Sequence, residues 1–368
     1  MHSRMRPPRS PSRFPVTAPL VVAVLVVASG LARGDGPAAT LEERGMLSLP
    51  GSVVDRDGRT RPIAETSGIV WAGADRYLAA MDGADRALLL SLAVAPDGAP
   101  LEARPEGTIA LDATRDWEDV AVVGSRQGLR MFLVEEETPA VREFLLDADL
   151  LAAKPAGGFS LRGMFPGMRS NRGPESLSAE PDGAALWTAS EEALAGDGPE
   201  VADGVRGVVR LSRIPLPAPP RGRRPSDPTG DRREWIYSVD PPHERFGLGT
   251  GPLLSGLVAL VALGEGRLLV LERSAGVGIP PLENRIYLVD VTGTGGAEGR
   301  ADADSEALEK TLLWRGSLGV NIEGLCAGPG LDDGRRVIVG IADNAAGDRP
   351  AGAAGPPNPL VVWTLTTP

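Results

Sequence analysis

The stretch Trp117-Glu118-Asp119-Val120-Ala121-Val122 places an acidic pair directly before a short apolar run. Similar openings recur near residues 65, 175, 255 and 323. Each is followed by a second apolar run, often ending in an acidic residue, and then by further strand-like runs. A repeat of roughly 50 residues or more, with four strands per unit, is typical of β-propeller blades.

The repeat predicts an all-β fold, a single β-propeller of five blades. Six blades is the alternative, if a long insert contains another sheet. The inserts 215–233, rich in Pro and Arg, and 292–306, rich in Gly, Ala and Asp, are expected to be exposed loops. The fifth unit has only three strand-like runs, and the segment 46–54 would supply the fourth. Pairing of the N- and C-terminal strands would then close the ring and remove an open sheet edge.

Residues 1–32 have the features of a secretory signal peptide. Four arginines precede the apolar run from Ala18 to Ala28, and small residues follow it. The run is shorter than the roughly 20 residues of a membrane-spanning helix, so an uncleaved anchor is the weaker alternative. We therefore expect an exported protein, periplasmic or extracellular, with a flexible segment over 33–44 and the propeller over 45–368. No integral membrane segment is expected after cleavage.

The charge of the chain argues against nucleic-acid binding. The net charge is −11, and about −15 once residues 1–32 are removed with their four arginines. Such a surface repels phosphate backbones and attracts cations. The glycine-rich loops 247–251 and 293–299 lack dinucleotide or P-loop spacing, so no nucleotide or organic cofactor is expected. We expect a monomer that acts on a small anionic or ester substrate.

Histidine chemistry is nearly absent. His2 lies in the signal segment, which leaves His243 in a Pro-rich loop, and Cys326 is the only cysteine. A catalytic triad or a His-rich zinc site is therefore disfavoured, and no internal disulfide can form. We expect His243 to be an ordinary loop residue.

Acidic residues at the strand ends remain as candidates for chemistry. A Glu just before an innermost strand would point into the mouth of the central channel, and four of the five units have one, with Ser255 as the exception. Oxygen ligands from several strands suit hard cations, above all Ca²⁺. Crowded carboxylates need a counter-cation or have raised pKa values, and both are useful in catalysis. The candidates are Glu65, Glu118, Asp119, Glu175, Glu191, Glu272, Glu323, Asp343 and Asn344.

Two arginines lie beside these acids in the sequence. Arg172 and Arg273 would serve as counter-ions, or would bind an anionic substrate through paired hydrogen bonds.

Four motifs follow one another along the chain: Glu65-Thr66-Ser67-Gly68-Ile69, Asn171-Arg172-Gly173-Pro174-Glu175-Ser176-Leu177, Leu269-Val270-Leu271-Glu272-Arg273 and Asn321-Ile322-Glu323-Gly324-Leu325. In this order they resemble the phytase-like family, which is described as having esterase-like activity of phytase. The resemblance runs from about residue 62 to 366. It implies a secreted or periplasmic β-propeller and a calcium-dependent phosphoesterase.

Three functions are compatible with these observations. The first is a metal-assisted phosphoester or ester hydrolase, in which Glu175 and Glu323 are catalytic and one of them is the general base. Arg172 and Arg273 would bind the substrate, and the metal ligands would be Glu65, Glu118, Asp119, Glu191, Glu272, Asp343 and Asn344. The second is a non-enzymatic propeller that binds a ligand or partner and holds structural calcium. The third is a lactonase-type hydrolase.

Overall fold

The computed structural model describes residues 38–125, 128–216, 228–246, 253–294, 296–298, 300–302, 304–317, 319–343 and 358–367. The predicted signal peptide lies outside the described residues, as does Asn344. Within the described ranges no helix is long and apolar enough to cross a membrane. The helical structure there is one short 3-10 turn, η1 (Pro228–Asp231).

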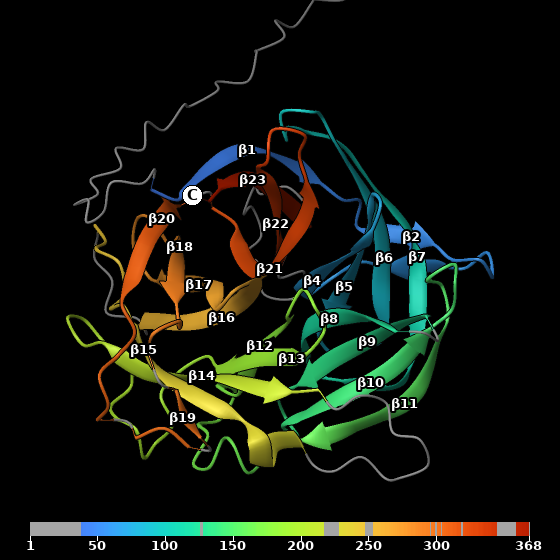
Figure 1. Cartoon of the computed structure of the whole chain (residues 1–368). Coiled ribbons are helices and arrows are strands. Elements are labelled where there is room, and N and C mark those ends of the chain that lie inside the picture. Colours follow the sequence, from blue (N-terminus) through green and yellow to red (C-terminus); the bar gives the residue numbers. More distant parts are fainter. Residues whose placement is uncertain are drawn as a thin grey trace, which may run out of the picture. The chain divides into compact units, whose positions relative to one another are not determined.

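Five antiparallel sheets make up the propeller, and each forms one blade (Figure 1). Blade I consists of β4 (Thr66–Gly73), β5 (Arg76–Met81), β6 (Ala84–Val94) and β7 (Pro100–Arg115). Blade II consists of β8 (Trp117–Ser125), β9 (Gly128–Glu135), β10 (Ala140–Leu146) and β11 (Ala153–Ser160). Blade III consists of β12 (Pro174–Ala179), β13 (Ala185–Ser190), β14 (Gly207–Pro215), β15 (Arg233–Val239) and β19 (Ala297–Glu298).

Blades IV and V complete the ring. Blade IV consists of β16 (Leu253–Gly264), β17 (Arg267–Gly276), β18 (Leu282–Asp290) and β20 (Lys310–Gly316). Blade V consists of β21 (Asn321–Gly330), β22 (Arg336–Asp343), β23 (Pro359–Thr366) and β1 (Thr40–Ser48). The inner strands β4, β8, β12, β16 and β21 each contact the inner strand of the next blade, and β21 contacts β4 again. The predicted five-bladed β-propeller is therefore confirmed, and the six-bladed alternative is not.

Apolar side chains fill the space between neighbouring blades. Between blades IV and V, Trp314 and Trp363 pack edge to face with ring centroids 5.1 Å apart. The inner and second strands are buried on both faces, which explains why their sequences are nearly continuous apolar runs.

The ring closes by pairing of β1 with β23, as expected, but through an earlier segment than 46–54. Met46 pairs with Val361, and pairing extends from Thr40 to Ser48. This outermost strand is largely exposed and is interrupted by a bulge at Arg44, so it has no clear apolar pattern. Residues 40–44, expected to precede the propeller, therefore belong to it.

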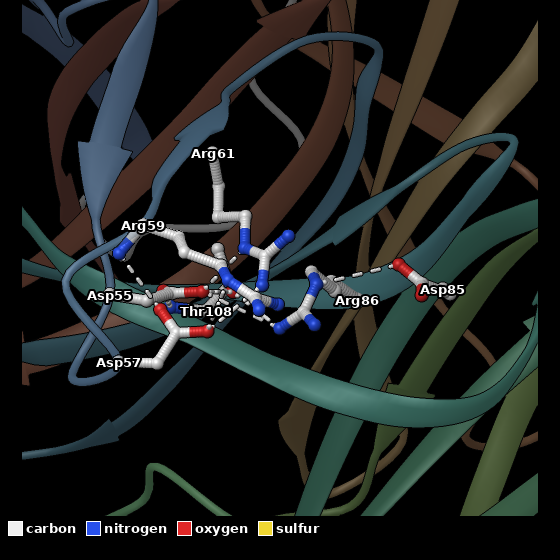
Figure 2. A network of polar contacts seen from close by, with 7 residues as sticks. All are labelled: Asp55, Asp57, Arg59, Arg61, Asp85, Arg86 and Thr108. Carbon is white, nitrogen blue, oxygen red and sulfur yellow. Dashed lines mark hydrogen bonds and ion pairs between the residues drawn. The ribbon is translucent and has the colours of Figure 1, made fainter.

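The remaining part of 46–54 forms a separate hairpin that is fixed to blade I. β2 (Ser52–Val54) pairs with β3 (Thr60–Pro62), and Asp55 in the turn is almost buried. Figure 2 shows Asp55 among the side chains of Arg61, Arg86 and Thr108. Its carboxylate accepts hydrogen bonds from the backbone N–H of Thr108 at 2.7 Å and from Nε of Arg61 at 3.1 Å. Arg86 of β6 donates hydrogen bonds to the same carboxylate and to Oγ1 of Thr108. The hairpin is therefore bound to the outer strands of blade I.

The insert 292–306 is more than an exposed loop. Its strand β19 adds a fifth strand to blade III, where Glu298 pairs with Arg233. Ala301 is buried, and its backbone N–H donates to Glu234 at 2.9 Å. Of the insert 215–233, residues 217–227 lie outside the described ranges.

The closure gives a testable prediction about stability. A chain that starts at residue 49 lacks β1, buried Leu41 and the outer hydrogen bonds of β23. We expect its free energy of unfolding, measured with urea, to fall by at least about 3 kcal/mol. A chain that starts at residue 39 keeps β1 and is the control. Equal midpoints for the two chains would show that the closure contributes nothing to stability.

Candidate functional site

A β-bulge occurs at the same place on the inner strand of each blade. There the register between the first and second strands shifts by one residue. A bulge redirects a side chain and interrupts the ladder, and bulges are frequent at binding sites. The residues at these bulge positions are Ser67, Glu118, Glu175, Val258 and Glu323.

Two further sets of positions follow from the same register. The entry positions lie two residues before each bulge: Glu65, Asp116, Gly173, Gly256 and Asn321. The hairpin-end positions lie opposite them, on the second strand of the blade or directly after it: Asp82, Glu136, Glu191, Arg273 and Asp343. Backbone bonds join the sets, for example from Asp82 N to Glu65 O at 2.8 Å and from Glu191 N to Gly173 O at 2.9 Å.

This register changes the alignment of the repeats in two blades. In blade I the bulge is Ser67, and Glu65 occupies the entry position. In blade IV the bulge is Val258, three residues after the expected Ser255. Glu118, Glu175 and Glu323 are equivalent to one another, as expected.

Members of all three sets line one cavity of about 520 Å³. Seven predicted site residues line it: Glu65, Glu118, Arg172, Glu175, Arg273, Glu323 and Asp343. Five others that line it were not predicted: Thr66, Ser67, Asp82, Asp116 and Asn171. Asp82 and Asp116 follow directly from the register, since they occupy a hairpin-end and an entry position.

Two arginines that line the cavity surround a buried carboxylate. Glu191 is 1% exposed and lies 2.9 Å from Nη1 of Arg172 and 2.8 Å from Nη2 of Arg273. Arg273 also donates to Glu323 and, at 3.3 Å, to Asn321. Glu192 lies 3.0 Å from Nε of Arg172. Glu191, predicted as a metal ligand, is therefore paired with both arginines.

Closely spaced carboxylates also meet at the cavity. Oxygens of Asp82, Asp116 and Glu118 lie within 4.8 Å of one another, and so do oxygens of Glu118, Glu136 and Glu175. Oδ1 of Asp82 is buried and has no hydrogen-bond partner among the described residues. Such an arrangement provides the closely spaced oxygen atoms that a hard cation requires.

Burial changes the protonation of this cluster. Desolvation raises the pKa of Asp82 to about 7, and the hydrogen bond and charge of Asp116 add to the effect. Desolvation, followed by neighbouring carboxylates, raises the pKa of Glu118 and of Glu175 well above the ordinary range. Glu323 has a pKa raised to about 7 by desolvation, although the charge of Arg273 acts in the opposite direction.

Besides Glu191, two further predicted metal ligands do not line the cavity. Asp119 is fully buried and accepts hydrogen bonds from the backbone N–H groups of Val120 at 2.8 Å and Leu177 at 2.7 Å. Glu272 accepts a hydrogen bond from Tyr237 at 2.6 Å and pairs with Lys310 at 2.5 Å. Successive side chains of a strand point to opposite faces, so Glu272 turns away when Arg273 lines the cavity.

Both ring nitrogens of His243 contact polar atoms of the protein. It is buried, Nδ1 lies 2.8 Å from Oγ of Ser274, and Nε2 lies 2.8 Å from the carbonyl oxygen of Pro280. The carbonyl can only accept, so Nε2 carries the proton. Neither His243 nor Ser274 lines the cavity.

A family model described as "Phytase-like: Esterase-like activity of phytase" matches residues 61–345. No curated protein matches the sequence.

Solved structures resemble the chain weakly. An aldose sugar dehydrogenase from Streptomyces coelicolor aligns with a TM-score of 0.40 and 11% identity, over 90% of this chain and 99% of that one. The periplasmic gluconolactonase of Pseudomonas aeruginosa aligns with a TM-score of 0.38 and 12% identity, over 89% of this chain and 100% of that one. An α-L-arabinofuranosidase of Podospora anserina aligns with a TM-score of 0.39 and 11% identity, over 89% of this chain and 98% of that one. At this level of similarity, what these proteins bind or catalyse says nothing about this chain.

The raised pKa values predict how stability depends on pH. The folded protein binds Asp82 and Glu323 protons up to about pH 7, whereas the unfolded chain releases them near pH 4. Without divalent cations, the free energy of unfolding should therefore fall as the pH rises from about 4 to about 7. Urea unfolding in chelator at several pH values measures this slope.

The matched variant for this test is Asp82→Asn, which removes one of the titrating carboxyls. Its slope should be smaller than that of the wild type over the same pH range. A wild-type stability that rises between pH 5 and pH 7 would contradict the protonated state of the cluster.

Proposed function

Because the chain belongs to the phytase-like family, we propose that it is a hydrolase of phosphate or other esters that works with a divalent cation, calcium above all. The observation that carries the proposal is the combination of carboxylates and arginines in the cavity lining. Closely spaced carboxylates from blades I, II and III and two guanidinium groups meet at the same cavity. A site of this kind can hold a cation and the anionic part of a substrate next to each other.

The carboxylates fit calcium. Asp82, Asp116 and Glu118 offer oxygens within 4.8 Å of one another, and Oδ1 of Asp82 is buried without a protein donor. Among the described residues, no Arg, Lys or His forms an ion pair with these three carboxylates. Calcium bound there would act as a Lewis acid that polarises the phosphoryl or carbonyl oxygen of the ester.

Glu323 is suited to act as the general base. Its pKa of about 7 lets it accept a proton from water near neutral pH. Arg273 and Asn321 both donate to Oε1, which fixes the carboxylate and leaves Oε2 for the attacking water.

Glu175 is suited to act as the general acid. Burial and the charges of Glu118 and Glu191 raise the pKa of its carboxyl well above the ordinary range, which favours the protonated form. It lines the same cavity as Glu323 and could donate its proton to the leaving oxygen. Arg172 and Arg273 would hold the anionic group of the substrate.

The predicted export signal fits this proposal. Calcium-binding modules outside the cell typically have dissociation constants of about 10⁻⁴–10⁻³ M, so a modest site would be occupied there. The proposal concerns a monomer with a small anionic or ester substrate.

The direct test is hydrolysis with and without calcium. Release of phosphate from phytate and from a simple phosphomonoester, and hydrolysis of a carboxylic ester, are measured in calcium and then in chelator. We expect calcium-dependent turnover of at least one substrate and a loss of about 10²-fold or more in Glu323→Gln. Glu180→Gln, which changes a carboxylate outside the cavity, is the control.

The outcomes separate the three candidate functions. No turnover of any ester, together with calcium-dependent stabilisation, would favour a binding propeller with structural calcium. Turnover of lactones alone would favour a lactonase-type hydrolase. Turnover that persists in chelator would contradict the role of the cation.

The pH dependence of turnover is a separate prediction. The base must be deprotonated, so kcat/KM should rise with pH through an apparent pKa near 7. It should fall again at higher pH, where Glu175 loses the proton that it donates. A profile that declines from pH 5 to pH 8 would contradict these roles.

A further inference from the structure

Glu191 joins the two arginines of the cavity into one unit. Its Oε2 lies 2.9 Å from Nη1 of Arg172, and its Oε1 lies 2.8 Å from Nη2 of Arg273. The arginines come from different places, since Arg172 precedes β12 of blade III and Arg273 lies on β17 of blade IV. One carboxylate therefore fixes the distance between two guanidinium groups across a blade interface.

The backbone holds Glu191 in this place. Its N–H donates to Gly173 O at 2.9 Å, and its carbonyl accepts from Leu257 N at 3.0 Å. Its side chain crosses the inner strand of blade IV at Gly256, where a Cβ would lie 2.4 Å from Cγ of Glu191. Glycine at this entry position leaves the space that the carboxylate occupies.

The charges of this unit are nearly balanced. The two guanidiniums are bound by Glu191 and also contact Glu192 and Glu323. Nη2 of Arg172 nevertheless has no partner among the described residues, and Arg172 lines the cavity. The unit therefore offers hydrogen-bond donors to a ligand but little net positive charge. A ligand group with several negative charges would remain uncompensated, because Arg172 and Arg273 are the cationic side chains among the described residues that line the cavity and both are already paired with carboxylates.

We propose that Arg172, Arg273 and Glu191 form an anion subsite for a group with one negative charge, such as a carboxylate or a phosphodiester, and that Glu191 sets this limit. The inference rests on the proposed function and narrows its substrate class. A polyanion such as phytate would be a poor ligand. Glu191 is a positioning residue, because it acts through the two arginines.

Binding of three related esters tests the charge limit without requiring turnover. Trimethyl phosphate is neutral, dimethyl phosphate carries one charge, and methyl phosphate carries about two at pH 8. Their binding to the wild type is followed by ³¹P NMR titration, in calcium and in chelator. We expect dimethyl phosphate to bind at least as tightly as methyl phosphate and more tightly than trimethyl phosphate.

Two variants separate charge from position. Glu191→Gln removes one negative charge and should shift the affinity ratio about tenfold in favour of methyl phosphate. Gly256→Ala displaces the carboxylate but keeps its charge, so it should weaken binding of both charged esters and leave the ratio unchanged. Glu180→Gln breaks a similar pair with Arg213 outside the cavity and should change neither quantity. Circular dichroism shows that each variant is folded.

The charge limit can be tested separately from the proposed hydrolase activity. Absence of turnover leaves the binding series interpretable. A wild type that binds methyl phosphate tenfold more tightly than dimethyl phosphate overturns the charge limit, even if no variant folds. An unchanged ratio in folded Glu191→Gln overturns the role of Glu191.

Discussion

The β-bulge on each inner strand is the constraint on which the site depends. An unbroken ladder would place alternate side chains on the two faces of a blade, buried between its neighbours. The extra residue interrupts this alternation where the strand enters the ring. At three blades the bulge residue is a glutamate, and the entry and hairpin-end positions follow from the same register. One backbone irregularity, repeated five times, thus accounts for most of the residues around the cavity.

Structurally equivalent positions in the five blades have side chains of different charge. Blades I and II supply Asp82, Asp116 and Glu118, whereas blade IV supplies Arg273 at a hairpin-end position and Val258 at the bulge. A symmetric ring of acids would attract cations evenly around the channel. Arg273 at a position where the other blades have an acid brings guanidinium hydrogen-bond donors to one part of the cavity lining, so that a bound anion would have a preferred orientation.

The fold could be predicted because inner and second strands are covered on both faces and must be apolar along their whole length. The closing strand could not, because Thr40–Ser48 is an exposed outer strand without that pattern. Glu118, Glu175 and Glu323 were found because they are equivalent in both sequence and structure. Glu272 was expected at the cavity and Asp82 was not, and the register explains why the structure has the reverse. A shift of one residue moves a side chain to the opposite face, and an unaligned sequence does not show where a bulge adds that residue.

The pairing of β1 with β23 has a consequence for how the protein is made. The two strands of this pair come from opposite ends of the chain and are synthesised first and last. β1 must therefore remain without its partner while the other four blades are completed, and a chain that is cut short before β23 leaves both blade V and the ring open. Contacts so distant in sequence form slowly and leave strand edges exposed in the meantime. A chain without β23 would therefore keep unpaired strand edges, which template pairing with other chains.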